Sequence, residues 1–366
     1  MDITIVIVTS PSKSNPAITL IEQVLDSLDN ISGVENAPII IVMDGFDIFD
    51  QARPKKGRIT HEMHLNYEQY WQNLMAAYPS PRVSIVRLDS HHGFAMAVKE
   101  GLQRCTTTFS LILQHDRAFH VPFTHIQKVC QVMHDKQHIR YVGFPTVMSQ
   151  HHLKSIHCRY SLLPLVDPSQ SHIDIYPDEL ALHPLIFWYD SNHIAHVQRY
   201  LQIYRPHQHL SERLRGALGL PAIKKMLLRR GDFIEDRFGQ QQRNLLTSYK
   251  DQEGLLMELF QWYGCYLLWS AQHSVMVVHL RGRHFDPVMD LIREKDRDQK
   301  ATEAIPLLPE SNVNDVEQDG TVVNIDLGNK MWSNVHTSFD EQDGRASLFD
   351  EAVCLNIADD ERRHDT

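Results

Sequence analysis

Polar and acidic side chains follow four short apolar runs in the first third of the chain. The runs are Ile3 to Val8, Ile39 to Met43, Val83 to Leu88 and Phe109 to Leu113. They lead into Thr9-Ser10, Asp44, Asp89 to Gly93 and Gln114-His115-Asp116. Each group alone could be an ordinary polar turn. In open α/β sheets, however, ligands bind outside the carboxyl ends of the strands, so the joint order of these groups predicts one ligand-binding site.

The elements that would position these residues have the pattern of an α/β domain built on a mostly parallel sheet. Short β-branched runs alternate with helical periodicity up to about residue 145. The expected helices cover Asn15-Pro16 to Leu28, with these two residues as cap and first turn, then Thr60 to Tyr78, Phe94 to Arg104 and Phe123 to Met133. A fifth strand is expected at Tyr141 to Phe144.

The second half of the chain begins with a His-, Ser- and Pro-rich stretch from Ser149 to about Pro184, which indicates a long and partly irregular excursion. Beyond it we expect a strand, a helix, a second helix and a last strand. They are Leu185 to Trp188, the segment from Ile194 to Leu201, Asp251 to Tyr263 and Val275 to Leu280. The ordered domain is expected to end near Arg293.

The composition is that of a globular protein with an acidic end. The 366 residues are 42% hydrophobic and carry a formal net charge of -10. Asp296 to Thr366 holds 17 of the 46 acidic residues but only 6 of the 36 basic ones. The preceding part is therefore close to neutral, and no nucleic-acid partner is expected. We interpret residues 294–366 as an acidic, largely disordered tail.

Cysteine usage and hydropathy favour a soluble, cytoplasmic protein. The five cysteines are widely spaced and include no C-x-x-C pair, which favours a reducing compartment. The apolar run at Ile3 to Val8 is too short for a signal peptide or a membrane span, and no apolar stretch of membrane-spanning length follows, so neither is expected. Residues 210–230 form a basic amphipathic segment, either a solvated helix face or a peripheral contact with an acidic acceptor or a membrane surface.

The order of the motifs resembles the nucleotide-sugar-binding half of GT-A glycosyltransferases, most of all the inverting family 2 group. The matching segments are His91-His92-Gly93, Ala97 to Gly101 and Phe109 to Asp116. Gln114 departs from the family pattern, because it stands where the first acid of Asp-x-Asp would be. The resemblance implies that residues 1–145 form the nucleotide-sugar-binding half of a GT-A domain and residues 146–293 its acceptor-binding and catalytic half.

The resemblance implies a nucleotide-sugar donor, such as a UDP-sugar, and a divalent metal, Mn²⁺ or Mg²⁺, held by Asp116. One carboxylate can suffice, because diphosphate oxygens and water complete the metal's coordination. His115 could add a nitrogen ligand, or its side chain could point into the sheet. The implied donor contacts are Thr9, Ser10, Asp44, His92, Gly93, Lys99, Gln114 and His115. Among them Asp44 would contact the base or ribose, and Lys99 would meet a phosphate or lie exposed on its helix.

The segment from Gly231 to Gly239 matches the Glu-Asp pattern that supplies the general base in inverting GT-A enzymes. The resemblance implies Asp236 as the base, with Glu235 or Arg237 tuning its pKa and orientation. The alternative is an ordinary acidic helix start.

Histidines and arginines near the end of the expected domain would complete the donor site by the same resemblance. His279 or His284 would add a metal ligand, with His284 favoured slightly for its expected place in a loop. Arg281 and Arg283 would neutralise the diphosphate leaving group.

An aromatic and acidic group, Trp188-Tyr189-Asp190, could bind a sugar acceptor, or it could pack in the core. The acceptor itself, a glycan, a lipid-linked sugar or a protein, is left open.

Two other functions compete with this interpretation. A catalytically inactive GT-A-like binding or scaffold protein is motivated by Gln114 and by Val98-Lys99, which differ from the family pattern. A sugar-nucleotide nucleotidylyltransferase would need a glycine-rich loop after the first strand, and residues 9–14 contain no glycine.

Overall fold

The computed structural model describes residues 2–48, 58–149, 152, 156, 160–166 and 172–280. The chain divides into two compact units, Met1–Pro287 and Val288–Thr366, and every described residue belongs to the first. The predicted tail, together with Arg281, Arg283 and His284, lies outside the described residues.

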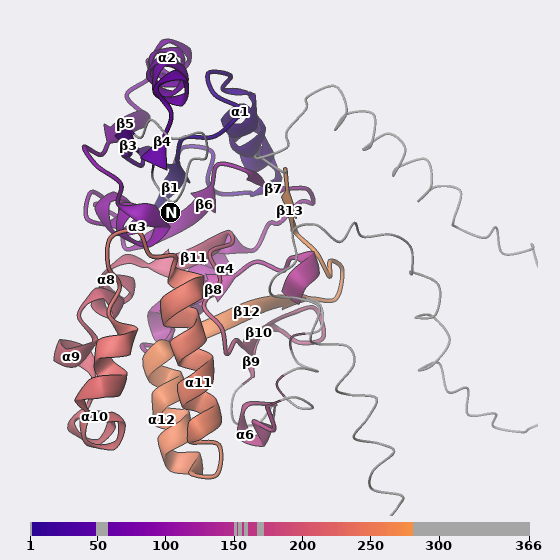
Figure 1. Ribbon diagram of the computed structural model, residues 1–366. Coiled ribbons are helices and arrows are strands. Elements are labelled where there is room, and N and C mark those ends of the chain that lie inside the picture. The colour runs from indigo at the N-terminus through magenta and orange to yellow at the C-terminus, as the bar shows by residue number, and fades with distance from the viewer. Residues whose placement is uncertain are drawn as a thin grey trace, which may run out of the picture. The chain divides into compact units, whose positions relative to one another are not determined.

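Nine strands of the described chain form one central sheet (Figure 1). They are β1 (Ile3–Thr9), β2 (Ile39–Met43), β5 (Val83–Arg87), β6 (Phe109–Gln114), β8 (Tyr141–Gly143), β9 (Ile173–Tyr176), β10 (Leu180–Pro184), β11 (His193–His196) and β12 (Cys265–Ser270). Their order is β5-β2-β1-β6-β11-β8-β12-β10-β9. Only β10 and β11 among them run against the others. The prediction of an α/β fold with a mostly parallel sheet is therefore confirmed.

The helices lie on the faces and at one end of this sheet (Figure 1). They are α1 (Thr19–Asp26), α2 (His61–Ala77), α3 (Gly93–Leu102), α4 (Ile126–Asp135), α6 (Leu163–Val166), α8 (Val197–Leu201), α9 (Pro206–His209), α10 (Glu212–Met226), α11 (Gln240–Ser248) and α12 (Glu253–Tyr263). Short 3₁₀ turns are η1 (Ser27–Asn30), η2 (Val147–Ser149) and η4 (Gln202–Tyr204), and η5 (Glu235–Gly239) is a π-helix. Two small ribbons pair β3 (Asp47–Ile48) with β4 (Arg58–Ile59) and β7 (Arg117–Phe119) with β13 (Val277–His279).

The central strands form where the sequence is rich in Ile, Val and Leu. Every residue of β1 and of β2 is buried, as expected for strands of a parallel sheet that is covered on both faces. In register, Val6 of β1 lies between Ile40 of β2 and Ile112 of β6. The residues that pair β1 with its two neighbouring strands thus also form the hydrophobic core.

Helix α2 begins at its capping residue, whereas α1 does not begin at the predicted one. The side chain of Thr60 accepts a hydrogen bond from the Met63 amide, so α2 starts where predicted. The predicted cap at Asn15-Pro16 is wrong, because α1 begins at Thr19. The Asn15 side chain instead accepts a hydrogen bond from the Ser12 amide and stabilises a turn.

Two predictions for the second half are wrong in their secondary structure. The expected strand Leu185 to Trp188 is irregular, and the strand lies earlier, in β10. The expected helix from Ile194 begins only at Val197, because Ile194 belongs to β11. The last part of the irregular excursion contains β9 and β10. Short apolar runs indicate burial, but they do not distinguish strand, helix and buried loop.

The predicted basic segment corresponds to α10. Its Leu214, Leu218, Ile223 and Met226 are buried, whereas Arg213, Arg215, Lys224 and Lys225 are exposed. A peripheral contact through residues 210–230 stays a prediction. Over the ranges that the structure describes, none of the helices combines the length and hydropathy needed to cross a bilayer.

Candidate active site

The sheet has a switch point beside its first strand. Strands β2 and β5 are added on one side of β1, and the chain then returns to place β6 on the other side. Crevices at such points, outside the carboxyl ends of the strands, are where α/β proteins bind ligands. Val8 pairs with Gln114, and the His115 amide donates to the Val8 carbonyl at 3.2 Å. The predicted residues after β1 and β6 therefore lie at one edge of the sheet.

Asp44, at the end of β2, holds the turn that begins α3. Its Oδ1 accepts from the His92 amide at 2.7 Å and its Oδ2 from the Gly93 amide at 3.0 Å. The His91 Nδ1 atom lies 3.0 Å from Oδ2, and this hydrogen bond raises the pKa of His91 above its ordinary value. The side chain is buried, and a carboxylate at a helix N-terminus satisfies amides that lack a partner. Its predicted contact with a base or ribose stays a prediction.

The turn at Gly93 is packed against the segment that precedes the predicted base. Gly93 has φ +73, and a Cβ atom there would lie 2.8 Å from the backbone of Gly231, so only glycine fits. The Gly231 amide donates to the His92 carbonyl at 2.8 Å, and the Ala95 amide donates to the Asp232 carbonyl at 3.2 Å. These bonds fix the second half of the domain to the predicted donor turn.

Asp116 and His279 meet at the same edge. The His279 Nε2 and Asp116 Oδ2 atoms are 3.4 Å apart, and the Leu280 amide donates to the Asp116 carbonyl at 2.7 Å. Adjacent ligands of an octahedral ion with bonds of about 2.1 Å lie about 3 Å apart, so the pair fits two positions of a Mg²⁺ or Mn²⁺ shell. In the described ranges no group of three or more His, Cys, Asp or Glu residues could hold a metal. Substrate oxygens and water would have to complete such a shell.

A cluster of carboxyl groups surrounds the start of η5. Asp190 is buried, and its Oδ1 accepts from the Glu235 amide at 3.2 Å. Burial, reinforced by the charge of Glu235, holds the pKa of Asp190 well above its usual range. Burial also raises the pKa of Glu235, while the nearby charge of Arg117 opposes the rise. Asp236 is exposed and Glu235 half-buried, so the predicted base is open to solvent, whereas Asp190 is not.

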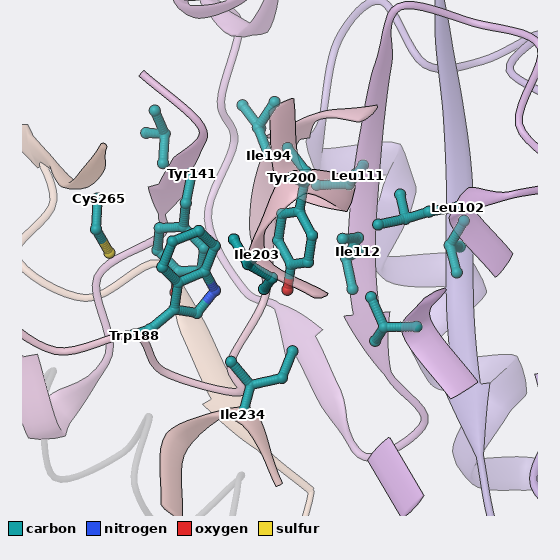
Figure 2. Packing of buried hydrophobic residues seen from close by; sticks show 14 of the residues in the cluster. Leu102, Leu111, Ile112, Tyr141, Trp188, Ile194, Tyr200, Ile203, Ile234 and Cys265 are labelled. Carbon is teal, nitrogen blue, oxygen red and sulfur yellow. The ribbon is translucent and has the colours of Figure 1, made fainter. Parts of the chain in front are cut away.

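The predicted acceptor platform is only partly accessible. Trp188 is 0% exposed, and its ring lies 5.0 Å from that of Tyr141 and 5.2 Å from that of Phe238. Figure 2 shows it in the core beside Tyr141. Its predicted contact with an acceptor is wrong, since a buried ring offers no face to a sugar, and the packing alternative is confirmed. Tyr189 is half-buried, with its ring 5.0 Å from that of Phe187.

Lys99 is not brought to the other predicted donor residues. It lies in the last turn of α3, about 9 Å along the helix from Gly93. Its Nζ lies 5.6 Å from the centre of the Tyr204 ring, in a cation–π contact. The predicted phosphate contact is therefore not supported by the geometry, and the lysine packs against Tyr204 of η4.

Two polar residues at the site were missed by the sequence analysis. Arg117 directly follows the acidic triplet, and its Nε donates to Gln114 Oε1 at 2.9 Å. Asn192 is fully buried, and its Nδ2 donates to the Arg117 carbonyl at 3.1 Å. A cation next to the triplet was visible in the sequence, but the position of Asn192 depends on β11 pairing with β6, which the sequence did not reveal.

Replacing Asp44 with alanine is expected to lower the free energy of unfolding by about 2–4 kcal/mol, because two buried amides lose a charged acceptor. The midpoint of thermal unfolding should fall by roughly 5–15 °C. Urea unfolding of Asp44→Ala would be compared with that of Asp89→Ala, an exposed acid in the loop between β5 and α3 that Asp44 binds. Equal stability of the two variants would contradict a structural role for the Asp44 carboxylate.

Comparison with known proteins gives only weak likenesses. No protein-family model and no curated protein matches the chain. Solved structures that match in part include S. aureus TarS 1-349 in complex with UDP-GlcNAc, at 14% identity and a TM-score of 0.25, over 40% of this chain and 34% of that one. The mannosyltransferase PcManGT from Pyrobaculum calidifontis, in complex with GDP-Man and Mn²⁺, matches at 12% identity and a TM-score of 0.31, over 60% and 46%. GalNAc-T7 with UDP, GalNAc and Mn²⁺ matches at 13% identity and 0.28, over 39% and 23%.

The chain thus spans less than half the length of each of these three proteins. TM-scores of this size carry no argument about function.

Proposed function

We propose that this chain is a metal-dependent glycosyltransferase of the GT-A type, which moves a sugar from a nucleotide-diphosphate sugar to an acceptor hydroxyl. The observation that carries the proposal is the approach of His279 to Asp116, 3.4 Å between Nε2 and Oδ2, at the switch-point edge of the sheet. A diphosphate leaving group needs positive charge, and an acceptor hydroxyl needs a base. The Asp116–His279 pair could hold a cation for the diphosphate, and Asp236 could serve as the base. The segment before Asp236 is hydrogen-bonded to the turn at His92, through the Gly231 amide.

The donor would enter the crevice between the ends of β1 and β6. Thr9 and Ser10 would line it from β1, and the His92-Gly93 turn from the side of β5. A Mn²⁺ or Mg²⁺ ion held by Asp116 and His279 would neutralise charge on the diphosphate as it leaves. Asp44 would act here by holding the turn, since its oxygens already accept hydrogen bonds from His92 and Gly93.

We assign the general base to Asp236. Its exposed carboxylate can reach an acceptor hydroxyl and take the proton while the acceptor oxygen bonds to the anomeric carbon and the diphosphate departs. A single displacement of this kind inverts the anomeric configuration. The backbone amide that follows Ile234 is fixed by the buried Asp190, whose Oδ1 accepts from the Glu235 amide at 3.2 Å, so the start of η5 that carries Asp236 is held in place. The acceptor, whether glycan, lipid-linked or protein, is not assigned.

The donor site is tested by thermal unfolding with a panel of UDP-, GDP-, CMP- and dTDP-sugars, each with and without Mn²⁺. A nucleotide sugar at a hundred times its Kd stabilises the fold by about 2.7 kcal/mol, which corresponds to a shift of roughly 5–10 °C. We expect one nucleotide to give such a shift only with metal, and Asp116→Asn to abolish it. Asp178→Asn, an exposed substitution at a turn with φ 61 that asparagine tolerates, serves as the control.

The alternatives give different results in the same assay. A metal-dependent shift without release of the nucleoside diphosphate in any acceptor extract would favour a binding or scaffold protein. Release of pyrophosphate from a nucleoside triphosphate and a sugar phosphate would identify a nucleotidylyltransferase. The absence of a shift with every nucleotide, in a folded sample, would reject the proposed function.

A further inference from the structure

Gln114 occupies the end of β6, and its side chain is used to orient an arginine. The Oε1 atom accepts a hydrogen bond from Arg117 Nε at 2.9 Å. A guanidinium has five N–H donors, and this bond uses the one on Nε. Among the described residues, neither Nη atom of Arg117 has a hydrogen-bond partner, and no acidic side chain forms a salt bridge with it. The two Nη nitrogens, called the fork below, have the geometry that suits phosphate oxygens. The bond on Nε orients this fork, and neither of its nitrogens binds another described residue.

The pairing of β7 with β13 puts this fork on the side of the ribbon where the candidate metal ligands meet. Arg117 is the direct cross-strand partner of His279, and side chains of directly opposed residues project from the same face. His279 contacts Asp116 on that face. The Asn192 side chain fixes the Arg117 backbone through its hydrogen bond to the carbonyl. The cation and the Asp116–His279 pair therefore lie at one edge of the site.

An amide at position 114 differs from a carboxylate in what it does to this cation. A carboxylate would pair with Arg117 and cancel its charge, and it would compete with phosphate for the fork. The amide oxygen of Gln114 accepts one hydrogen bond and carries no charge, so the guanidinium keeps its full attraction for an anion. The charge of Arg117 also reaches Glu235, whose pKa it lowers against the effect of burial.

We propose that Arg117, positioned by Gln114, is a diphosphate-binding residue of the donor site. In the family pattern, a second carboxylate at this position helps to bind the metal ion, and the ion supplies positive charge. In this chain the guanidinium of Arg117 supplies positive charge directly. The inference rests on the proposed function, because it takes the anion to be the diphosphate of a nucleotide.

The test compares binding of UDP and UMP in the presence of Mn²⁺ by isothermal titration calorimetry, or of the corresponding pair for the base found in the thermal panel. Loss of a phosphate–arginine interaction should weaken UDP binding about 10- to 100-fold in Arg117→Gln. UMP binding should change less than about threefold, because the fork contacts the second phosphate. Arg117→Lys should recover only part of the loss, since a lysine is a point charge without the Nε donor.

Two further variants separate positioning from charge. Gln114→Leu should weaken UDP binding several-fold with Arg117 still present, and Gln114→Glu should weaken UDP binding when no metal is added while tightening Mn²⁺ binding. Arg215→Gln, an exposed arginine of α10, is the matched control, and thermal unfolding would verify that every variant is folded.

Wild-type affinity for UDP in folded Arg117→Gln would overturn the inference and leave the proposed function intact. Failure of the wild type to bind either nucleotide would reject the proposed function itself.

Discussion

Asp236→Asn is expected to lower kcat by about 10²- to 10⁴-fold, the usual contribution of a positioned general base. Asparagine keeps the size of the side chain but cannot accept the proton of the acceptor hydroxyl. The Kd for the donor should stay within about threefold of the wild-type value, because the residue lies on η5 and not at the end of β1 or β6. The rate would be followed as release of the nucleoside diphosphate, by transfer to an acceptor or by hydrolysis of the donor.

The neighbouring acid provides the comparison for this experiment. Glu235→Gln removes a half-buried carboxyl group whose pKa is raised by burial, and we expect it to lower kcat less than Asp236→Asn does. If Glu235→Gln instead caused the larger loss and Asp236→Asn were nearly as active as the wild type, the base would be Glu235.

The free energy of unfolding is expected to fall steeply between about pH 6.5 and pH 4. Burial lowers the pKa of His193 to about 3 and that of His152 to about 4, whereas both titrate near 6.5 in an unfolded chain. The stability that depends on their neutral form is fully present above the unfolded pKa. It is lost as the pH falls, because the unfolded chain then binds protons that the native chain does not. For these two residues the loss is roughly 3–5 kcal/mol each once the pH is below both values.

Other histidines modify this acid sensitivity. Burial also lowers the pKa of His138, His183 and His196 to about 4, but these side chains are more accessible and solvent screening reduces their contribution. The raised pKa of His91 acts in the opposite direction, so its contribution is present at low pH and is lost as the pH rises through the folded value. Stability should therefore be greatest near neutral pH.

Urea unfolding at several values between pH 7.5 and pH 4.5 measures the effect. His193→Phe retains a ring beside Tyr141, whose centre lies 4.3 Å from that of His193, but cannot titrate. In this variant the unfolded chain takes up about one proton less on acidification than in the wild type, so the free energy of unfolding should fall less steeply with decreasing pH. His61→Gln, at an exposed histidine, should behave as the wild type does. An unchanged slope in His193→Phe would contradict the assignment of acid sensitivity to this residue.

Local signals in the sequence sufficed for the first half of the sheet. The run at Ile39 to Met43 is apolar and rich in β-branched residues, that at Phe109 to Leu113 is apolar except for Ser110, and both form strands at these positions. Thr60 is a capping residue ahead of a helical pattern, and it caps α2. In these segments the propensity, the capping signal and the burial agree, so that no distant contact is needed to decide the structure.

The parts of the site that depend on long-range pairing could not be derived in the same way. The sequence left His279 and His284 as alternatives, and only the pairing of β13 with β7 brings His279 to Asp116. Trp188 has the composition of a sugar platform, yet Tyr141 and Phe238, from distant parts of the chain, enclose it. Arg117 was missed because its significance depends on the bond to Gln114 and on the strand opposite it. Such contacts are properties of the topology and not of the local pattern.

The pairing of β7 with β13 also sets the order in which the protein can be completed during translation. Asp116 and His279 are 163 residues apart in the chain, which corresponds to roughly 8–30 s of synthesis at about 5–20 residues per second. Strands β1, β2, β5 and β6 can assemble within that interval, whereas the ribbon cannot form until Leu280 has left the ribosome. A ligand that needs both residues therefore cannot assist the folding of the nascent first half, and it can stabilise the chain only after the whole domain has been made.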